Sequence, residues 1–244
     1  MRDNHLQPEG QKWSFDESVA AAFPEMLQNS VPGYDVMRWT TTELASRFIR
    51  NKQDCLITKI ADLGASRGDS FKPLLERFPD LRVVAYECSE PMRKTLDSIQ
   101  GPPENPQPVT LPVNADLRTA SFSGFGPFCV ALSILTLMFV PPEHRLSLLH
   151  RVYDSLLPGG AFFIVEKTLC EYPVTNEMLF AEYEDMKRRN GYTDEQILRK
   201  KVSLEGVLMP LPASTTENML KAVGFREVQS YWRTLQFCGW VCVK

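Results

Sequence analysis

The sequence predicts an α/β protein built around a mostly parallel sheet. From Leu56 onward, short apolar runs rich in β-branched residues alternate with amphipathic stretches, which is typical of repeated strand and crossover-helix units. A glycine-containing turn at 64–68 follows the first of these runs and precedes a helical pattern. With 244 residues, of which 43% are hydrophobic and 23% charged, the chain can bury one sizeable core. We therefore expect a single domain over 1–244, with an N-terminal helical cap over 1–52 and a helical insertion over 175–207.

The expected elements follow one another with short connections. In the cap, two helical patterns between Phe15 and Arg50 are separated by the turn-forming residues 31–34. Gly159 and Gly160 follow a long amphipathic stretch, so we expect them to end its helix. The core pattern predicts strands at 56–62, 82–87, 108–113, 129–132 and 161–166, and helices at 70–77, 91–99 and 142–156.

The C-terminal part is expected to add an antiparallel pair of strands to the mostly parallel sheet. A helical pattern at 215–223 is ended by Gly224. Two apolar runs follow, at 227–231 and 237–243, and the short segment between them favours an antiparallel pair. The cap and the insertion lie outside the repeat, so each is a candidate lid over a pocket.

Composition and charge narrow the class of protein. No stretch approaches the roughly 20 uninterrupted apolar residues of a membrane span, and residues 1–10 lack the apolar region of a signal peptide, so we expect a cytoplasmic protein. A formal charge of −3 and a pI of about 5.7 argue against a nucleic-acid partner and favour a small-molecule substrate. The six cysteines lack the short paired spacings of a disulfide framework or zinc site, so we expect reduced thiols and no metal.

The turn at 64–68 has the features of a binding loop. Gly64 and Gly68 permit a tight turn and a close approach of the backbone to a ligand. Glu87 ends the second expected strand, where an acidic side chain accepts hydrogen bonds from both hydroxyls of a ribose. Ser66 replaces the glycine that lets a pyrophosphate approach, so a ribose-containing ligand without phosphate fits better, and S-adenosylmethionine (SAM) is such a ligand.

The remaining parts of a SAM site follow along the chain. The amino-acid end of SAM is expected against Gly64, the ribose against Glu87, and the adenine near Asp116 and Leu117, where the Asp116 carboxylate accepts from the adenine amino group. An isolated glycine turn is also compatible with an ordinary tight connection. The agreement of the turn, the strand-end acid and the Asp116 loop favours the binding site.

The same turn also matches G-x-S-x-G, the nucleophile elbow of α/β-hydrolases, with Ser66 as the nucleophile. A hydrolase needs a downstream acid and then a histidine on a loop after the last strands. The histidines available downstream, His144 and His150, both fall within the expected helix 142–156. The hydrolase therefore remains the weaker alternative.

Six motifs lie outside the cofactor loop, at residues 13–17, 23–26, 30–34, 166–167, 190–192 and 204–205. They resemble the carboxy-S-adenosyl-L-methionine synthase family, of which the chain is identified as a divergent member. The resemblance covers almost the whole chain and implies the Rossmann-like fold of class I SAM-dependent methyltransferases, SAM as cofactor and a homodimer. By this resemblance the pocket is lined by Tyr34, Gly64, Ala65, Ser66, Glu87, Cys88, Asp116 and Leu117.

Three departures from the family pattern fall in this pocket. The resemblance implies an arginine that holds the carboxylate of the carboxylated cofactor; Lys201 matches that position, and lysine lacks the planar two-pronged grip of arginine. Arg199 lies nearby as a second candidate for the substrate, whereas a helix is expected to point it and Lys200 elsewhere. A pocket asparagine of the family is matched by Ile134 with Ser133 beside it, and the ribose acid is Glu87 rather than aspartate.

These departures suggest a retained cofactor and a changed reaction. We expect methyl transfer to a small molecule, with Tyr34, Tyr183 and Tyr192 as candidate catalytic residues, because aromatic faces, including those of Trp39 and Phe180, stabilise a sulfonium. Packing alone also accounts for such aromatics. Two alternatives stay open: the prephenate-dependent synthesis of carboxylated SAM for transfer-RNA wobble modification, and cyclisation of SAM to an azetidine amino acid with release of methylthioadenosine.

Overall fold

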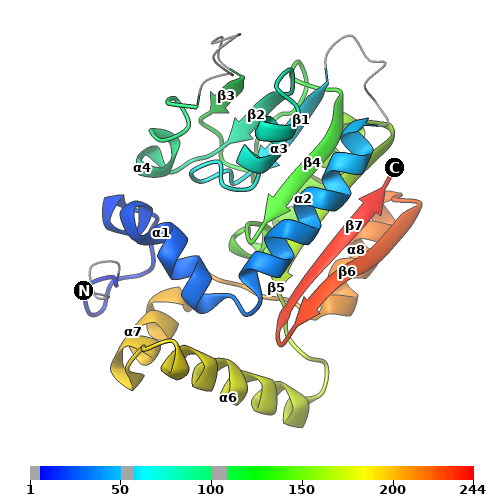
Figure 1. Cartoon of the computed structure of the whole chain (residues 1–244). Coiled ribbons are helices and arrows are strands. Elements are labelled where there is room, and N and C mark those ends of the chain that lie inside the picture. Colours follow the sequence, from blue (N-terminus) through cyan, green and yellow to red (C-terminus); the bar gives the residue numbers. More distant parts are fainter. Residues whose placement is uncertain (1–5, 51–57, 100–108) are drawn as a thin grey trace.

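A single seven-stranded sheet organises the structure. The computed structural model describes residues 6–50, 58–99 and 109–244, and its strands are ordered β3-β2-β1-β4-β5-β7-β6 (Figure 1). Strands β1 to β5 are mutually parallel, while β7 pairs antiparallel with both β5 and β6. The order reverses between β1 and β4, which is where open α/β sheets bind ligands. The strands are β1 (Lys59–Leu63), β2 (Arg82–Tyr86), β3 (Thr110–Val113), β4 (Phe128–Ile134), β5 (Leu156–Lys167), β6 (Glu227–Thr234) and β7 (Phe237–Val243).

Both faces of the central strands are buried. In β5, Phe162 belongs to the core on one face and its neighbour Phe163 to the core on the other, because successive strand residues point in opposite directions. Phe162 packs in the same core as Trp240, and Phe163 in the same core as Val130. This two-sided burial explains why the central strands read as continuous apolar runs.

Helices cover the two faces and one end of the sheet. Helix α2 contacts β4 and β5 on one face, whereas α5 and α8 pack together on the other. Helices α1, α6 and α7 lie beyond the carboxyl ends of the parallel strands (Figure 1). The helices are α1 (Glu17–Ser30), α2 (Tyr34–Arg50), α3 (Lys72–Arg77), α4 (Glu90–Arg93), α5 (Pro142–Ser155), α6 (Pro173–Arg189), α7 (Asp194–Leu204) and α8 (Ala213–Val223), with a 3₁₀ turn η1 (Leu137–Phe139).

Local hydrogen bonds and one glycine fix the ends of three helices, α1, α7 and α8. The Asp16 carboxylate accepts from the Val19 N–H at 2.9 Å and caps α1. Thr193 and Gln196 form a capping box at the start of α7. Gly224, in the left-handed conformation, ends α8 as expected. These caps fix the start of α1, the start of α7 and the end of α8 by contacts within the chain.

The structure corrects several expected boundaries. Helix α5 already ends at Ser155, and Gly159 and Gly160 lie inside β5 rather than ending the helix. The four residues 157–160 stand opposite the single residue Cys129, since Phe128 pairs with Leu156 and Val130 with Ala161. Helix α4 is shorter than the expected 91–99, and α3 begins at Lys72 rather than at residue 70. The antiparallel C-terminal pair is confirmed.

Parts of some expectations lie outside the described residues: the start of the strand at 56–62, residue 108 of the third strand, and both ends of the cap. None of the five cysteines in the described ranges forms a disulfide, and Cys55 lies outside them. Of the helices in the described part of the chain, none is long and apolar enough to cross a membrane.

Candidate functional site

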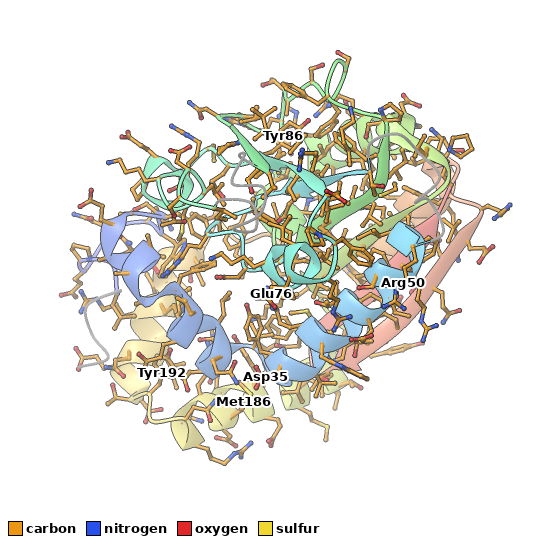
Figure 2. All side chains as sticks on the ribbon, turned by 45° about the horizontal axis from the view of Figure 1, so that its top comes forward. Asp35, Arg50, Glu76, Tyr86, Met186 and Tyr192 are labelled. Carbon is orange, nitrogen blue, oxygen red and sulfur yellow. The ribbon has the colours of Figure 1, made fainter. Side chains whose placement is uncertain are left out.

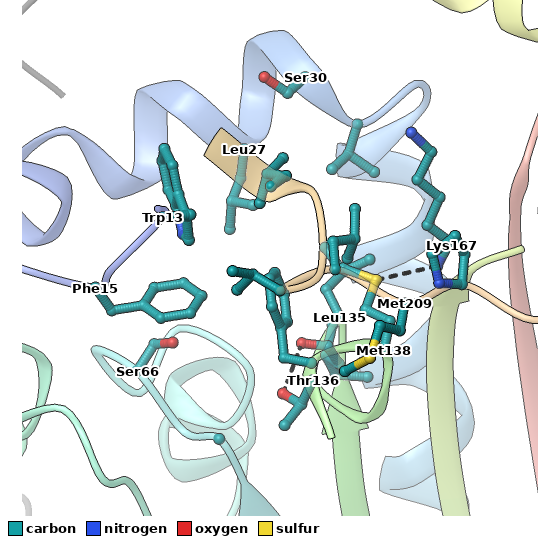
Figure 3. A pocket seen from close by; sticks show the side chains of 18 of the residues that line it. Trp13, Phe15, Leu27, Ser30, Ser66, Leu135, Thr136, Met138, Lys167 and Met209 are labelled. Atoms are coloured by element: carbon teal, nitrogen blue, oxygen red, sulfur yellow. Dashed lines mark hydrogen bonds between the residues drawn. The ribbon is translucent and has the colours of Figure 1, made fainter. Parts of the chain in front are cut away.

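A large pocket lies where the carboxyl ends of the parallel strands meet the lid helices, which are α1 of the cap and α6 and α7 of the insertion. Its volume is about 610 Å³, within the span of about 300–1,000 Å³ found for small-molecule sites. Its walls come from the cap, the loops after β1, β2, β3 and β4, the end of β5, and helices α6 and α7. Figure 3 shows Trp13 and Phe15 of the cap on the same side of this pocket as Ser66. The pocket thus occupies the sheet edge at which α/β folds bind ligands.

The loop after β1 presents its backbone to the pocket. The N–H groups of Gly64 and Ala65 donate to the Tyr86 carbonyl at 2.8 and 3.0 Å, which ties the loop to β2. Gly64 has a φ of 68°, and a Cβ at this position would overlap the side chain of Thr136. Ser66 has a φ of 48°, a left-handed conformation that few non-glycine residues adopt. Both the conformation and the lack of space therefore require glycine at position 64.

Glu87 follows β2 directly, and its carboxylate is fixed at the pocket wall. Oε2 accepts from the Ser66 N–H and Oε1 from the Ser89 N–H, both at 2.8 Å. Burial raises the pKa of this carboxyl, and the N–H groups of Ser89 and Ser66 oppose that rise. Each oxygen keeps a free lone pair beyond these two bonds, so the carboxylate can accept from a ligand without losing its orientation.

The loop after β3 brings two more expected residues to the pocket, Asp116 and Leu117. Arg118 holds the Asp116 carboxylate through its Nε, at 2.8 and 3.0 Å from the two oxygens. This hydrogen bonding lowers the pKa of Asp116. Cys88 also lines the pocket and is exposed. An adenine amino group near Asp116 would therefore share its carboxylate with Arg118.

The end of β4 differs from the expectation for Ser133. Ile134 lines the pocket, whereas Ser133 is 2% exposed and is not among the lining residues. Neighbouring strand residues point to opposite faces, so only one of the two can face the ligand. The polar contact expected from Ser133 is thus not available in the pocket, and the wall there is apolar.

The candidate aromatic residues divide into two groups. Tyr34 and Tyr183 line the pocket, with Phe180 beside them, and burial raises the pKa of both phenols. Tyr192 is buried but does not line it; Figure 2 shows Tyr192 in the insertion, on the other side of the molecule from Tyr86 of the sheet. Trp39 is 64% exposed and points to solvent. The structure therefore keeps Tyr34 and Tyr183 as candidates at the pocket.

Four lysines converge on the lid side of the pocket. Lys167 ends β5, Lys187 lies on α6, and Lys200 and Lys201 lie on α7. Burial lowers the pKa of Lys167 and of Lys200 to about 7, and that of Lys187 to about 8, and the repulsion among these amines adds to the effect. Lys201 instead pairs with Glu184 at 3.3 Å and is 60% exposed.

Two expectations for the insertion are corrected. Arg199 turns away from the pocket, and its Nε donates to the Gln7 carbonyl at 2.7 Å. Lys200, which was expected to point elsewhere, lines the pocket and lies 5.0 Å above the ring of Trp13. Lys187 also reaches it, although its neighbours Arg188 and Arg189 form ion pairs on the surface. A run of basic residues on a helix does not reveal which members face inward.

Lys167 was not proposed as a site residue from the sequence. The available signal was a lysine two residues after the apolar run 161–165, at the end of the expected strand 161–166, where the carboxyl end of a parallel strand meets a ligand site. The adjacent Glu166 has its pKa raised to about 8 by burial and accepts from the Leu137 N–H at 3.0 Å. Glu166 thus holds η1, whereas Lys167 enters the pocket.

The nucleophile-elbow alternative lacks its partner. His144 and His150 lie on α5, and neither lines the pocket that Ser66 lines. The geometry therefore does not assemble the triad that a serine hydrolase requires.

Among the residues of 6–50, 58–99 and 109–244, no three His, Cys, Asp or Glu side chains are grouped so as to hold a metal ion.

Comparison with known proteins shows the family to which the chain belongs. No family model matches the sequence. A carboxy-S-adenosyl-L-methionine synthase of Klebsiella pneumoniae is 32% identical over 240 residues, which are 95% of this chain and 91% of that protein. The synthases of Actinobacillus succinogenes and Trichlorobacter lovleyi are 31% and 30% identical over 95% of this chain. The chain belongs to the carboxy-S-adenosyl-L-methionine synthase family.

Solved structures show the fold of this synthase-family protein. An O-methyltransferase family protein from Burkholderia thailandensis superposes with a TM-score of 0.64 at 16% identity, over 94% of this chain and 60% of that one. The plantazolicin methyltransferase BpumL, in complex with SAH, superposes with a TM-score of 0.59 at 12% identity, over 93% of both chains. The expected Rossmann-like fold of class I SAM-dependent methyltransferases is therefore confirmed.

Proposed function

We propose that this synthase-family protein is a SAM-dependent transferase that moves the methyl group of SAM to a small molecule bound at the lid side of the pocket. Bound SAM supplies an electrophilic methyl carbon on its sulfonium. The observation that carries the proposal is the fixed carboxylate of Glu87 beside the Gly64 turn, in a pocket that continues to the lid helices. Membership of a SAM-using family and the methyltransferase fold support it.

The residues present fit SAM along the sheet edge. The turn of Gly64, Ala65 and Ser66 brings main chain to the pocket wall, where we expect the amino-acid end of SAM. The free lone pairs of Glu87 suit the two ribose hydroxyls. Asp116 and Leu117 then lie on the side expected for the adenine. This arrangement positions the methyl group toward Tyr34, Tyr183 and the lysines, so that the protein contributes orientation and exclusion of water.

The synthesis of carboxylated SAM is a second candidate because the named relatives are carboxy-S-adenosyl-L-methionine synthases at 30–32% identity. Against it stands the lysine that replaces the family arginine. Lys201 is paired with Glu184 at 3.3 Å, so its charge is already neutralised by a neighbouring carboxylate. A single-pronged, paired ammonium is a poor substitute for a two-pronged guanidinium on a carboxylate.

The test is mass spectrometry of nucleosides formed by the purified protein from SAM alone, from SAM with prephenate, and from SAM with a small-molecule cell extract. Adenosylhomocysteine that forms only with the extract is the expected result, and fractionation then identifies the acceptor. Carboxylated SAM with prephenate would establish the second candidate instead. Methylthioadenosine from SAM alone would establish cyclisation. The Glu87→Ala variant, handled identically, controls for contaminating enzymes.

We also propose a single domain, a cytoplasmic location, no nucleic-acid partner and a homodimer. Exposed apolar side chains support a dimer, since Trp39 is 64% exposed and Tyr172, Val174 and Met178 of the α6 region are 67–72% exposed. Light scattering of the purified protein across a concentration series tests the dimer. A constant monomer mass would contradict it.

A further inference from the structure

Aromatic rings rather than an acid surround the amine of Lys167 in the pocket. Its Nζ lies 4.3 Å from the ring centroid of Tyr183, 5.2 Å from that of Phe180 and 5.9 Å from that of Phe237. Figure 3 shows its side chain across the pocket from Ser66. In the part of the chain that the structure describes, no carboxylate lies within ion-pair distance of Lys167.

The charged groups around Lys167 come from three elements and are mostly cationic. On α6, Lys187 lies 4.3 Å from the same Tyr183 ring, and Glu184 is the nearby acid. On α7, Lys200 and Lys201 face the same space, and Lys201 engages Glu184. Burial, then the repulsion of Lys187 and Lys201, lowers the pKa of Lys167 to about 7, while Glu184 opposes the shift. A free amine is thus present near neutral pH.

We propose that Lys167 is the general base that removes the proton from the attacking atom of the acceptor. This inference rests on the proposed function. The acceptor nucleophile forms a bond to the methyl carbon while the bond from that carbon to sulfur breaks. The electron pair of the broken bond stays on sulfur, giving the neutral thioether adenosylhomocysteine. The proton of the nucleophile passes to Nζ of Lys167, which becomes an ammonium and later releases that proton to water.

Four other titratable groups of the pocket, Tyr183, Glu87, Lys187 and Lys200, suit this role less well. The pKa of Tyr183 is raised by burial, so its phenol stays protonated at neutral pH. Glu87 is committed to two backbone N–H groups on the cofactor side. Lys187 and Lys200 project from the lid helices, whereas Lys167 ends β5, next to β4, in the sheet itself. A base on the sheet keeps its position relative to the Gly64 loop whatever the lid does.

The test compares Lys167→Gln and Lys167→Arg with the wild-type protein. The rate of adenosylhomocysteine formation is measured from pH 5.5 to 9 over a dilution series of the active extract fraction, which separates the maximal rate from the half-saturating amount. We expect the wild-type maximal rate to rise with pH to a plateau, with a midpoint near 7. Both variants should lose about 10²–10⁴-fold in maximal rate and lose that midpoint, because neither glutamine nor arginine accepts a proton at these pH values. Lys94→Gln, at an exposed surface position, is the control and should behave as wild type.

A second measurement reads the ionisation of Lys167 without turnover. Trace labelling with acetic anhydride, followed by peptide mass spectrometry, should give a midpoint near 7 for Lys167, far below the value of about 10.4 of an ordinary lysine. A midpoint near 10 would overturn the proposal. So would rescue by Lys167→Arg, or a rise in the half-saturating amount at constant maximal rate, since either result identifies a cationic clamp for an anionic acceptor.

Different results would contradict the proposed methyl transfer and the proposed role of Lys167. If the wild-type protein forms methylthioadenosine from SAM alone, methyl transfer to an acceptor is wrong. The amino group of SAM must also lose a proton before it attacks, so the same variants and pH series, read on methylthioadenosine, still decide the role of Lys167. If the wild-type protein neither binds SAM nor forms a product from it, both proposals fall.

Discussion

The two walls of the pocket, a cofactor wall and a lid wall, are formed by different parts of the chain. At the ends of β1 and β2, the wall consists of main-chain N–H groups, a glycine without space for a Cβ, and one carboxylate locked at 2.8 Å by two N–H groups. At the end of β5 and on α6 and α7, the wall consists of long side chains, among them Lys167, Lys187 and Lys200. The first wall is fixed by the course of the chain, whereas the second can change by single substitutions without altering the fold. A family can therefore keep one cofactor while its members change the reaction.

The two walls also carry opposite ionisable groups. Burial raises the pKa of Glu87 on the cofactor wall and lowers that of the lysines on the lid wall, so both sets are driven toward their neutral forms. On the cofactor wall, the N–H groups of Ser66 and Ser89 compensate the charge of Glu87. The lid wall has Glu184 as its nearby acid, engaged by Lys201. The lid lysines are thus the part of the pocket whose state depends most on pH and ligand.

The largest effect is expected on the cofactor wall, from Gly64→Ala. An added Cβ overlaps Thr136 and is held at a φ of 68°, so we expect a loss of about 3 kcal/mol in the free energy of unfolding and loss of SAM binding. Gly124→Ala is the matched control, with a φ of 87° but open space around the Cβ, and should lose only about 1 kcal/mol. Urea unfolding and calorimetry measure the two terms. Equal losses in both variants would show that the Gly64 turn is not closely packed.

Glu87→Ala should have the next largest effect, on affinity rather than on folding. The variant loses the carboxylate to which we expect the two ribose hydroxyls to donate, which corresponds to about 2 kcal/mol and to roughly 30-fold weaker binding of adenosylhomocysteine. Glu90→Ala, three residues farther on and exposed, serves as the control and should leave the affinity unchanged. Titration calorimetry measures the affinity of both variants for adenosylhomocysteine. Unchanged binding in Glu87→Ala would remove the basis of the proposed function.

The difference between the walls also explains what the sequence reveals. The Gly64 turn and Glu87 could be predicted because both depend on local chain geometry, a tight turn after one strand and an acid at the end of the next. The lid wall could not, because helix rotation decides whether Arg199 or Lys200 faces inward. At the end of β4, strand alternation decides between Ser133 and Ile134. The Gly159–Gly160 pair was misassigned as a helix end, since glycine also serves where extra residues leave a strand ladder.

Lys200→Met tests whether the charge of the half-buried Lys200 on the lid wall destabilises the fold. The pKa of Lys200 is lowered to about 7 in the folded protein, so its ammonium is destabilising below pH 7, and stability rises as pH increases from 7 toward the unfolded value near 10.4. We expect the variant to be more stable than wild type at pH 6, on the order of 1 kcal/mol, with a smaller advantage at pH 9. Urea unfolding at both pH values gives the comparison. An advantage that grows with pH would contradict the assignment.

Lys201→Arg should have the smallest effect. The side chain is 60% exposed and paired with Glu184, and an arginine can keep that pair, so SAM affinity should change less than twofold. For the same reason, arginine alone should not produce carboxylated SAM from prephenate, because Glu184 continues to occupy its guanidinium. The double variant Lys201→Arg with Glu184→Gln frees that group, and mass spectrometry of its products shows whether the clamp works once released. Carboxylated SAM from the single variant would mean that one residue sets the chemistry of the lid wall, and that the surrounding lysines contribute little to the choice of reaction.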